Sequence, residues 1–146
     1  MKITPVNIDF SIFSISLQQF LNENHPLLSN DLDFIKTRGD GAAELFEMFR
    51  SEGVNIETAI ANANEYLFSG LHFSLHNMVK GIIENEFSDV IESEKSWDAA
   101  LRLIPIYAPF IGKYEYNDDF EDSDDYKQLY TEITGAILIY LNQYGV

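Results

Sequence analysis

Apolar residues recur at spacings of three and four along most of this chain of 146 residues, and that recurrence constrains its fold more than any other feature. On an α-helix this spacing places apolar side chains along one face, which a folded chain buries against a neighbouring element. Residues that begin or end helices separate the segments, and no convincing pair of strands interrupts them. The sequence therefore predicts an all-α fold, with about six helices in a compact single domain spanning residues 1–146.

Each expected helical segment has a capping or terminating residue. The first segment runs over about 9–24, is capped by Asp9 or Ser11 and has an apolar line that begins at Phe10. The second runs from a cap within Ser29–Asp31 to about Ser51, the third from a cap at Asn55 to a stop at Gly70, and the fourth from Ser74 to about Phe87. The fifth begins at Ser93 or Ser96 and is interrupted at Pro105 and Pro109, and the sixth runs from about Asp124 to Tyr144 after a cap at Ser123. The expected apolar side of the last helix consists of Tyr126, Tyr130, Ile133, Ile137, Tyr140, Leu141 and Tyr144.

Two glycines, Gly39 and Gly41, lie inside the second segment and bracket Asp40. Each costs about 1 kcal/mol in a helix interior relative to alanine. A phosphate-binding loop is not indicated, because no GxxxxGK pattern lies nearby. We therefore expect an irregularity of the helix at this point.

The chain contains no cysteine. A disulfide scaffold, a thiolate zinc site, an iron–sulfur cluster and a cysteine nucleophile are thereby excluded. At the N-terminus, Pro5, Asn7 and Asp9 interrupt the apolar core that a signal peptide needs. No stretch approaches the roughly 18 apolar residues of a membrane helix. The expected location is the cytoplasm.

Acidic residues outnumber basic ones by 24 to 9, which gives a formal charge of −15. Binding to nucleic acid or anionic lipid normally requires clustered Lys and Arg, and the basic residues here are scattered. Direct nucleic-acid and membrane binding are therefore not expected. A basic protein partner is compatible with the charge, and so is a surface that serves solubility alone.

The acids are densest between residues 115 and 125, where seven carboxylates occur within eleven residues: Glu115, Asp118, Asp119, Glu121, Asp122, Asp124 and Asp125. Dense carboxylate oxygen suits calcium, but no register supplies the glycine and glutamate positions of an EF-hand loop. Phe120, in the centre of the run, is expected to anchor it to the core. The favoured interpretation is a solvated acidic loop that leads into a capped helix. The second interpretation is a docking surface for a basic partner, formed by these seven residues and Phe120.

Four tyrosines accompany this run: Tyr114, Tyr116, Tyr126 and Tyr130. They are compatible with the rim of a binding site and with ordinary packing, and packing is favoured.

The sequence His72-Phe-Ser-Leu-His76 has the HxxxH spacing of many metal sites. Ser74 resembles an N-cap, however, which places His72 before the helix, and the glutamate of the HExxH pattern is replaced by Phe73. The alternative is two partly buried histidines at a helix junction. No GxSxG, GxGxxG or P-loop pattern occurs, so no catalytic residue and no cofactor is expected, and an enzyme is the less favoured class.

Several strings resemble a bacterial family catalogued as a domain of unknown function. They are Phe34-Ile-Lys-Thr-Arg38 with Ala42-Ala-Glu44, Gly70-Leu-His-Phe-Ser74 followed by His76, Asp118-Asp-Phe120, Leu129-Tyr-Thr-Glu-Ile-Thr-Gly135, Ile139-Tyr-Leu141 and Gly145. The resemblance implies an all-helical fold and a gene often carried on conjugative or other mobile elements. Gly39 and Gly41 depart from the alanine-rich helix expected there. The resemblance supplies no catalytic or binding residues.

Three functions follow as hypotheses. The first is a protein-interaction module of a bacterial mobile element that binds a basic protein through its acidic surface, with mimicry of DNA charge as a specific form. The second is a metal-dependent enzyme or metal-binding protein centred on His72 and His76. The third is a structural or oligomer-forming protein, since the sequence leaves the oligomeric state open.

Overall fold

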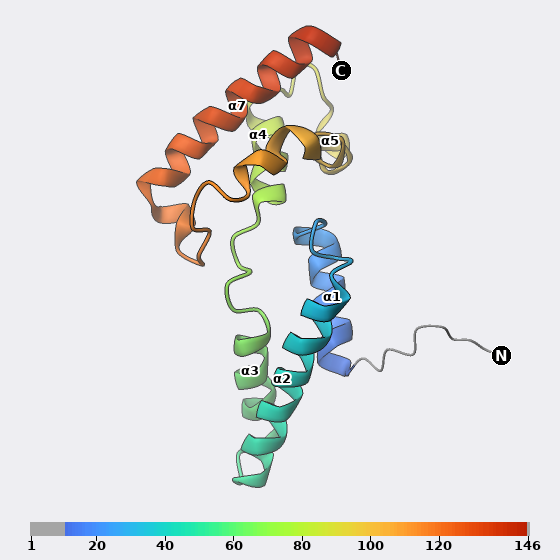
Figure 1. The fold of residues 1–146 in the computed structure, drawn as a ribbon, viewed down its shortest axis with the longest axis vertical. Helices are drawn as coiled ribbons and strands as arrows, with labels where there is room; N and C mark the ends of the chain where they lie inside the picture. Colours follow the sequence, from blue (N-terminus) through green and yellow to red (C-terminus); the bar gives the residue numbers. More distant parts are fainter. Residues whose placement is uncertain (1–10, 146) are drawn as a thin grey trace, which may run out of the picture. The chain divides into compact units, whose positions relative to one another are not determined.

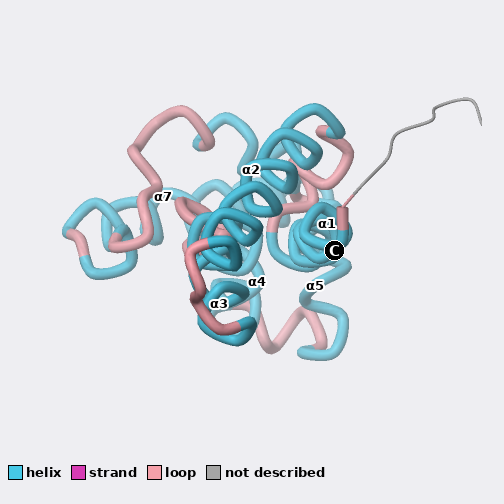
Figure 2. Tube along the Cα trace, turned by 90° about the horizontal axis from the view of Figure 1, so that it is seen from below, coloured by secondary structure: helices cyan, strands magenta, loops and turns pink. Residues whose placement is uncertain are grey.

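The computed structural model describes residues 11–145, and every regular element in that range is helical (Figure 2). Seven α-helices and three short 3-10 helices occur in this range, without a strand. The all-α prediction is confirmed, with one α-helix more than the six expected. The sequence features at Pro5, Asn7, Asp9 and Phe10 lie outside the described residues.

The chain packs as two compact units, which Figure 1 shows by their labelled helices. Of the described residues, the first unit contains 11–23 and 27–69, and the second contains 24–26 and 70–145. A single domain over residues 1–146 requires the two units to fold as one, and this stays a prediction.

The first unit consists of three helices, α1 (Ile12–Asn24, whose last residue is counted with the second unit), α2 (Leu32–Ser51) and α3 (Ile56–Leu67). A side-chain oxygen caps each of them: Ser11 Oγ accepts from the Ser14 N–H, Asp31 Oδ1 from the Phe34 N–H and Asn55 Oδ1 from the Thr58 N–H. These caps satisfy backbone donors that the first turn of a helix leaves free. The predicted starts at Asp31 and Asn55 are confirmed, and Ser11 caps the first helix.

Helices α1 and α2 meet closely at Gly39. Helix α2 continues unbroken through Gly39 and Gly41, so the predicted irregularity is wrong. A Cβ atom on Gly39 would lie 2.8 Å from Ser14 Cα of α1, closer than two carbon atoms can pack. Ser14 is fully buried there, and its hydroxyl donates to the Ile35 carbonyl at 3.3 Å. The glycine therefore serves the contact between helices and does not break α2.

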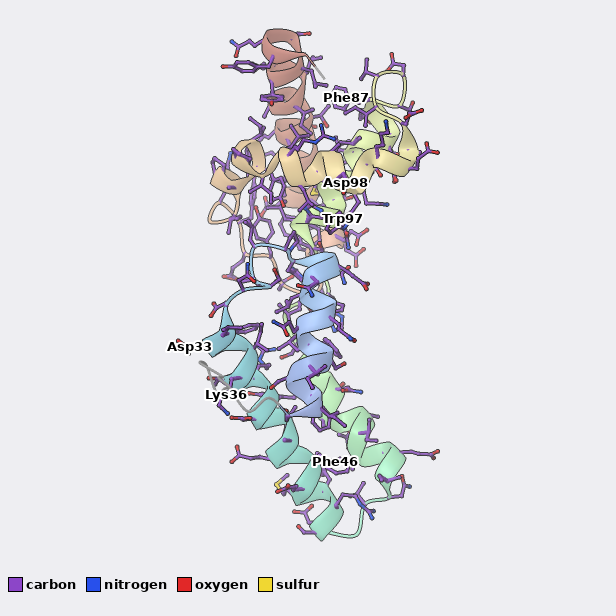
Figure 3. The ribbon with its side chains drawn as sticks, turned by 90° about the vertical axis from the view of Figure 1, so that its right-hand side faces the viewer. Asp33, Lys36, Phe46, Phe87, Trp97 and Asp98 are labelled. Carbon is purple, nitrogen blue, oxygen red and sulfur yellow. The ribbon has the colours of Figure 1, made fainter. Side chains whose placement is uncertain are left out.

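Aromatic rings add to the contacts within this unit. The rings of Phe13 in α1 and Phe46 in α2 have centroids 6.0 Å apart, and Phe46 is labelled in Figure 3. Phe20 and Phe68 lie 4.9 Å apart. Both tilted pairs fall within the range in which ring contacts are favourable.

Arg38 joins α2 to the end of α3. Its Nη1 atom donates to the carbonyls of Tyr66, Leu67 and Ser69 at 3.3, 3.1 and 2.9 Å. These carbonyls lie at the end of α3 and in the turn that follows it, and the Tyr66 carbonyl also accepts from the Ser69 N–H at 3.2 Å. The negative end of the helix dipole stabilises the positive guanidinium at this position. Arg38 thus closes the C-terminus of α3 from a neighbouring helix.

The second unit contains four α-helices, α4 (Leu75–Glu86), α5 (Ser96–Arg102), α6 (Ile104–Tyr107) and α7 (Asp124–Tyr144), and the 3-10 helices η1 (Ser93–Lys95), η2 (Ala108–Phe110) and η3 (Phe120–Asp122). Helix α4 packs against α5 and α7, and α6 packs against α7. The predicted fifth helix is divided at Leu103, because Pro105 lacks an N–H and favours the first turn of a new helix.

Helix α7 buries Leu129, Ile133 and Ile137 completely. Leu129 was not on the predicted apolar side, whereas Tyr144, which was, is 73% exposed. The buried line is therefore shifted toward the aliphatic residues, and the tyrosines flank it. Although α7 is 21 residues long, no helix within residues 11–145 is both long and apolar enough to cross a membrane.

Substitution Gly39→Ala is expected to lower the free energy of unfolding by about 1–3 kcal/mol, because the added methyl group collides with the backbone of Ser14. Gly135→Ala is the matched control, since a Cβ atom there meets no atom within 4 Å. It is expected to stabilise α7 by up to about 1 kcal/mol. Urea unfolding followed by circular dichroism measures both, and equal effects of the two substitutions would contradict the close approach at Gly39.

Candidate functional site

The strongest concentration of charge in the second unit is the acidic loop, defined as residues 115–125. It includes η3 and ends in the first turn of α7. All seven of its carboxylate residues are exposed: Glu115, Asp118, Asp119, Glu121, Asp122, Asp124 and Asp125. Six of the seven have no ion pair within the described part of the chain, and Asp118 has only the exposed His72 at 3.9 Å. The loop therefore presents a largely unneutralised negative surface.

Phe120 holds this loop to the core. Its side chain is only 3% exposed, and its ring centroid lies 4.8 Å from that of Tyr116 and 4.9 Å from that of Phe73. Tyr114 and Tyr126 complete the surround at 5.9 and 6.2 Å. The predicted anchor role of Phe120 is confirmed. Because the ring is buried, it stabilises the loop and does not itself offer a contact surface to a partner.

Asp118 forms a second attachment of the loop. Its two carboxylate oxygens accept hydrogen bonds from the backbone N–H groups of Gly70 and His72, at 3.1 and 3.0 Å. Partial burial raises the pKa of Asp118, but these two bonds to the charged form and the nearby imidazole of His72 together outweigh it, so that the pKa lies below its usual value. Asp118 therefore fixes the loop to the segment that precedes α4.

The end of the loop passes directly into α7. Ser123 Oγ accepts from the Tyr126 N–H at 3.2 Å, which confirms the predicted cap. Asp124 and Asp125 occupy the first turn, where the helix dipole stabilises negative charge by about 0.3–1 kcal/mol. Two of the loop's carboxylates therefore lie beside the N-terminus of α7.

A groove of about 340 Å³ lies beside the loop, between α4 and the first turns of α7. Its lining includes Glu121 from the loop, Tyr126 and Tyr130 from α7, and Asn85 from α4. Tyr130 donates its hydroxyl to Glu86 at 2.9 Å and accepts from Asn85 at 3.4 Å. The favoured packing role is confirmed for Tyr114, Tyr116 and Tyr126, whose rings surround Phe120, while Tyr126 and Tyr130 also line the groove.

The α4 side of the groove was not identified from the sequence. Asn77, Gly81 and Asn85 line it at intervals of four residues. This spacing places them on one face of the helix, apart from its buried stripe of Val79, Ile82 and Ile83. The sequence signal that could have identified this side of the groove is the small or polar residue at every fourth position, on a face of α4 apart from its apolar stripe.

The two histidines of the HxxxH sequence have different surroundings. His72 precedes α4, as predicted from the Ser74 cap, and its side chain is 59% exposed beside Asp118. His76 is 2% exposed, and its Nδ1 shares a hydrogen bond of 2.8 Å with the hydroxyl of Tyr107. Only His72 lines the groove. The structure thus places one histidine at the surface and the other in the core.

Within residues 11–145, no group of three or more His, Asp or Glu side chains is arranged to hold a metal ion. A metal site formed by His72 and His76 would therefore have no third His, Asp or Glu ligand among the described residues. The metal pair stays a prediction, and the geometry around His76 gives it no support.

Substitution Phe120→Ala is expected to cost about 3–5 kcal/mol of unfolding free energy, because it removes a ring packed against Phe73 and Tyr116. Backbone amides of residues 115–125 are expected to exchange hydrogen faster than in the native chain. Leu138→Ala, at a position in α7 that is 50% exposed, is the control and should change stability by less than about 0.5 kcal/mol. Unchanged exchange in the loop of the Phe120 variant would contradict the anchor.

Stability is expected to fall as the pH drops below 6.5, the ordinary pKa of histidine. Burial lowers the pKa of His76, and burial also lowers that of His25, whose Nε2 lies 2.8 Å from the Leu71 carbonyl. The unfolded chain therefore binds these protons more readily than the folded one, so that acid favours unfolding. The stabilising contribution is complete above pH 6.5 and is lost as the pH falls toward the folded-state values.

Urea unfolding between about pH 7.5 and about pH 5 measures this slope, above the range in which most carboxylates titrate. His76→Gln should reduce the slope, and the double variant with His25→Gln should reduce it further. A double variant with the slope of the native chain would exclude these histidines as its source.

Comparison with solved structures finds a similar fold in the crystal structure of protein PG0816 from Porphyromonas gingivalis. The two chains are 32% identical in sequence, with a TM-score of 0.81 over 91% of each chain. Comparison with curated proteins gives no match. Residues 6–146 match the family described as domain of unknown function (DUF1896). Since that match spans nearly the whole sequence, the chain belongs to the DUF1896 family.

Proposed function

We propose that this protein is an interaction module that binds a basic protein partner through the acidic loop and the adjoining groove. The observation that carries the proposal is the combination of seven exposed carboxylates with a buried anchor, Phe120. A flexible acidic tail would lose conformational entropy on binding, whereas an anchored loop presents its charges in a fixed arrangement.

Local charge favours a cationic partner. Lys113, the nearest basic residue before the loop, already pairs with Glu132 of α7 at 2.6 Å. Lys127 is the only other basic residue between positions 113 and 130. The carboxylates of the loop are therefore left to attract Lys or Arg side chains of another molecule, which raises association rates and favours the correct partner.

The groove supplies contacts that charge alone does not. Tyr126 and Tyr130 border it, and aromatic faces bind the cationic heads of Lys and Arg. Glu121 lies at the same border and offers a carboxylate to the same cation. A basic side chain entering the groove would thus meet an aromatic ring and a negative charge together.

The finer form of the proposal is a module encoded on a bacterial mobile element that mimics the charge of DNA. A DNA-binding protein presents Lys and Arg side chains spaced to meet phosphates. A fixed array of carboxylates competes for those side chains. Mimicry therefore predicts that the partner cannot hold duplex DNA and this protein at the same time.

Neutralising the loop is expected to abolish partner binding. The variant Asp119→Asn, Glu121→Gln, Asp122→Asn, Asp125→Asn removes four charges but keeps Asp118, which the backbone of Gly70 and His72 requires. Retention of basic proteins from a bacterial extract should fall at least about tenfold, and the retained proteins should elute as salt rises above about 0.15 M. Quantitative mass spectrometry of the retained proteins measures this.

The control variant removes the same charge from the first unit, at four exposed positions: Glu44→Gln, Glu47→Gln, Glu57→Gln and Glu65→Gln. It should retain the partner as the native chain does. Retention that survives neutralisation of the loop, equal loss in both variants, or the absence of any retained basic protein would each contradict the proposal. Release of the partner by added duplex DNA separates charge mimicry from binding at another surface of the partner.

A further inference from the structure

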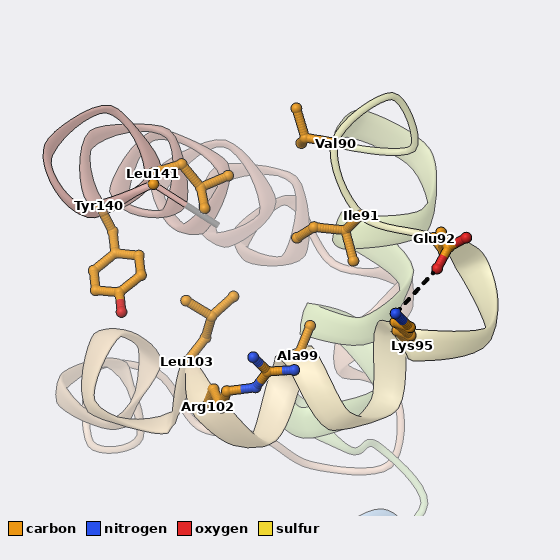
Figure 4. A pocket seen from close by; sticks show the side chains of 10 residues that line it. Val90, Ile91, Glu92, Lys95, Ala99, Arg102, Leu103, Tyr140 and Leu141 are labelled. Carbon is orange, nitrogen blue, oxygen red and sulfur yellow. Dashed lines mark ion pairs between the residues drawn. The ribbon is translucent and has the colours of Figure 1, made fainter.

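A second hollow in the second unit has a different chemical character from the acidic loop. It lies between α5, the C-terminal part of α7 and the segment at 90–92, and has a volume of about 430 Å³ (Figure 4). This volume falls in the range of about 300–1,000 Å³ that small-molecule sites occupy. Apolar side chains form most of its wall: Val90, Ile91, Ala99, Leu103 and Leu141.

Arg102 gives the hollow its polarity. Figure 4 shows the side chain of Arg102 extending along the wall beside Ala99 and Leu103. Within residues 11–145 its guanidinium makes no hydrogen bond and no ion pair. Arg102 is exposed, and whereas Arg38 and Arg50 each donate to backbone carbonyls, its guanidinium is left to solvent and to any anion that enters the hollow.

The remaining charges of the hollow do not neutralise Arg102. Lys95 and Glu92 also line it, and they pair with each other at 3.2 Å. Among the described residues that line the hollow, two cations and one anion leave an excess of one positive charge. A planar guanidinium with free N–H groups binds a carboxylate through two parallel hydrogen bonds.

From this arrangement we propose that the hollow binds a small apolar monocarboxylate, such as a medium-chain fatty acid. The aliphatic body would replace water against Ile91, Leu103 and Leu141, and the carboxylate would lie on Arg102. The site is separate from the acidic loop in residues and opposite to it in charge. It therefore stands whether or not the acidic loop binds a protein.

The test is a titration of the full chain with octanoate, followed by proton–nitrogen correlation NMR. Octanoate should shift amide signals of residues 90–103 and 140–145, and 1-octanol, which lacks the charge, should bind the same residues more weakly. Arg102→Met should weaken octanoate binding about tenfold, the effect of losing a hydrogen bond to a charged group, and should leave octanol binding unchanged.

Lys127→Met is the matched control, because it removes one exposed basic residue that does not line the hollow. It should bind octanoate as the native chain does. Ala99→Phe, which fills the hollow, should abolish the binding of both probes. Three results would overturn the proposal: no localised shifts with octanoate, equal weakening by Arg102→Met and Lys127→Met, or equally tight binding of octylamine, which carries the opposite charge.

Discussion

The acidic surface of this protein depends on the burial of Phe120. One buried ring cannot by itself offset the conformational entropy that the ordered residues of the loop lose. The bonds of Asp118 to the backbone N–H groups of Gly70 and His72 and the Ser123 cap of α7 add to its contribution. The loop is thus fixed at its start, its centre and its end.

This arrangement separates the forces that hold the loop from the charges it displays. Aromatic contact and backbone hydrogen bonding position the chain, so its remaining carboxylates need no cation of their own for the loop to fold. Mutual repulsion among them is a cost, which the dipole of α7 reduces for Asp124 and Asp125. A cationic partner would remove that repulsion, and salt would weaken the attraction over a distance of about 8 Å.

Local sequence signals predicted the elements well, because caps and glycine stops act within a few residues. Asp31, Asn55, Ser74 and Ser123 all cap the helices expected of them. The predicted helix irregularity at Gly39 was wrong. The glycine is needed there because Ser14, which is distant in sequence, packs too closely for a side chain at position 39. The groove and the hollow beside Arg102 were missed for the same reason, since each is formed by helices that are far apart in the chain. Phe120 was identified because a lone aromatic ring among carboxylates is the side chain there that gains most from burial.

The histidines show why spacing alone is a weak guide to a metal site. For His72 and His76 to hold one ion, His76 would have to leave the core, break its bond to Tyr107 and expose the apolar residues around it. Burial also raises the pKa of Tyr107 to about 12, so its hydroxyl stays protonated and keeps a proton to share with the imidazole. A buried polar group that loses its partner costs about 1–3 kcal/mol. The free energy of metal binding through His72 and His76 would have to exceed that cost as well as the cost of unpacking α4. Binding of a basic protein at the acidic loop requires no such rearrangement.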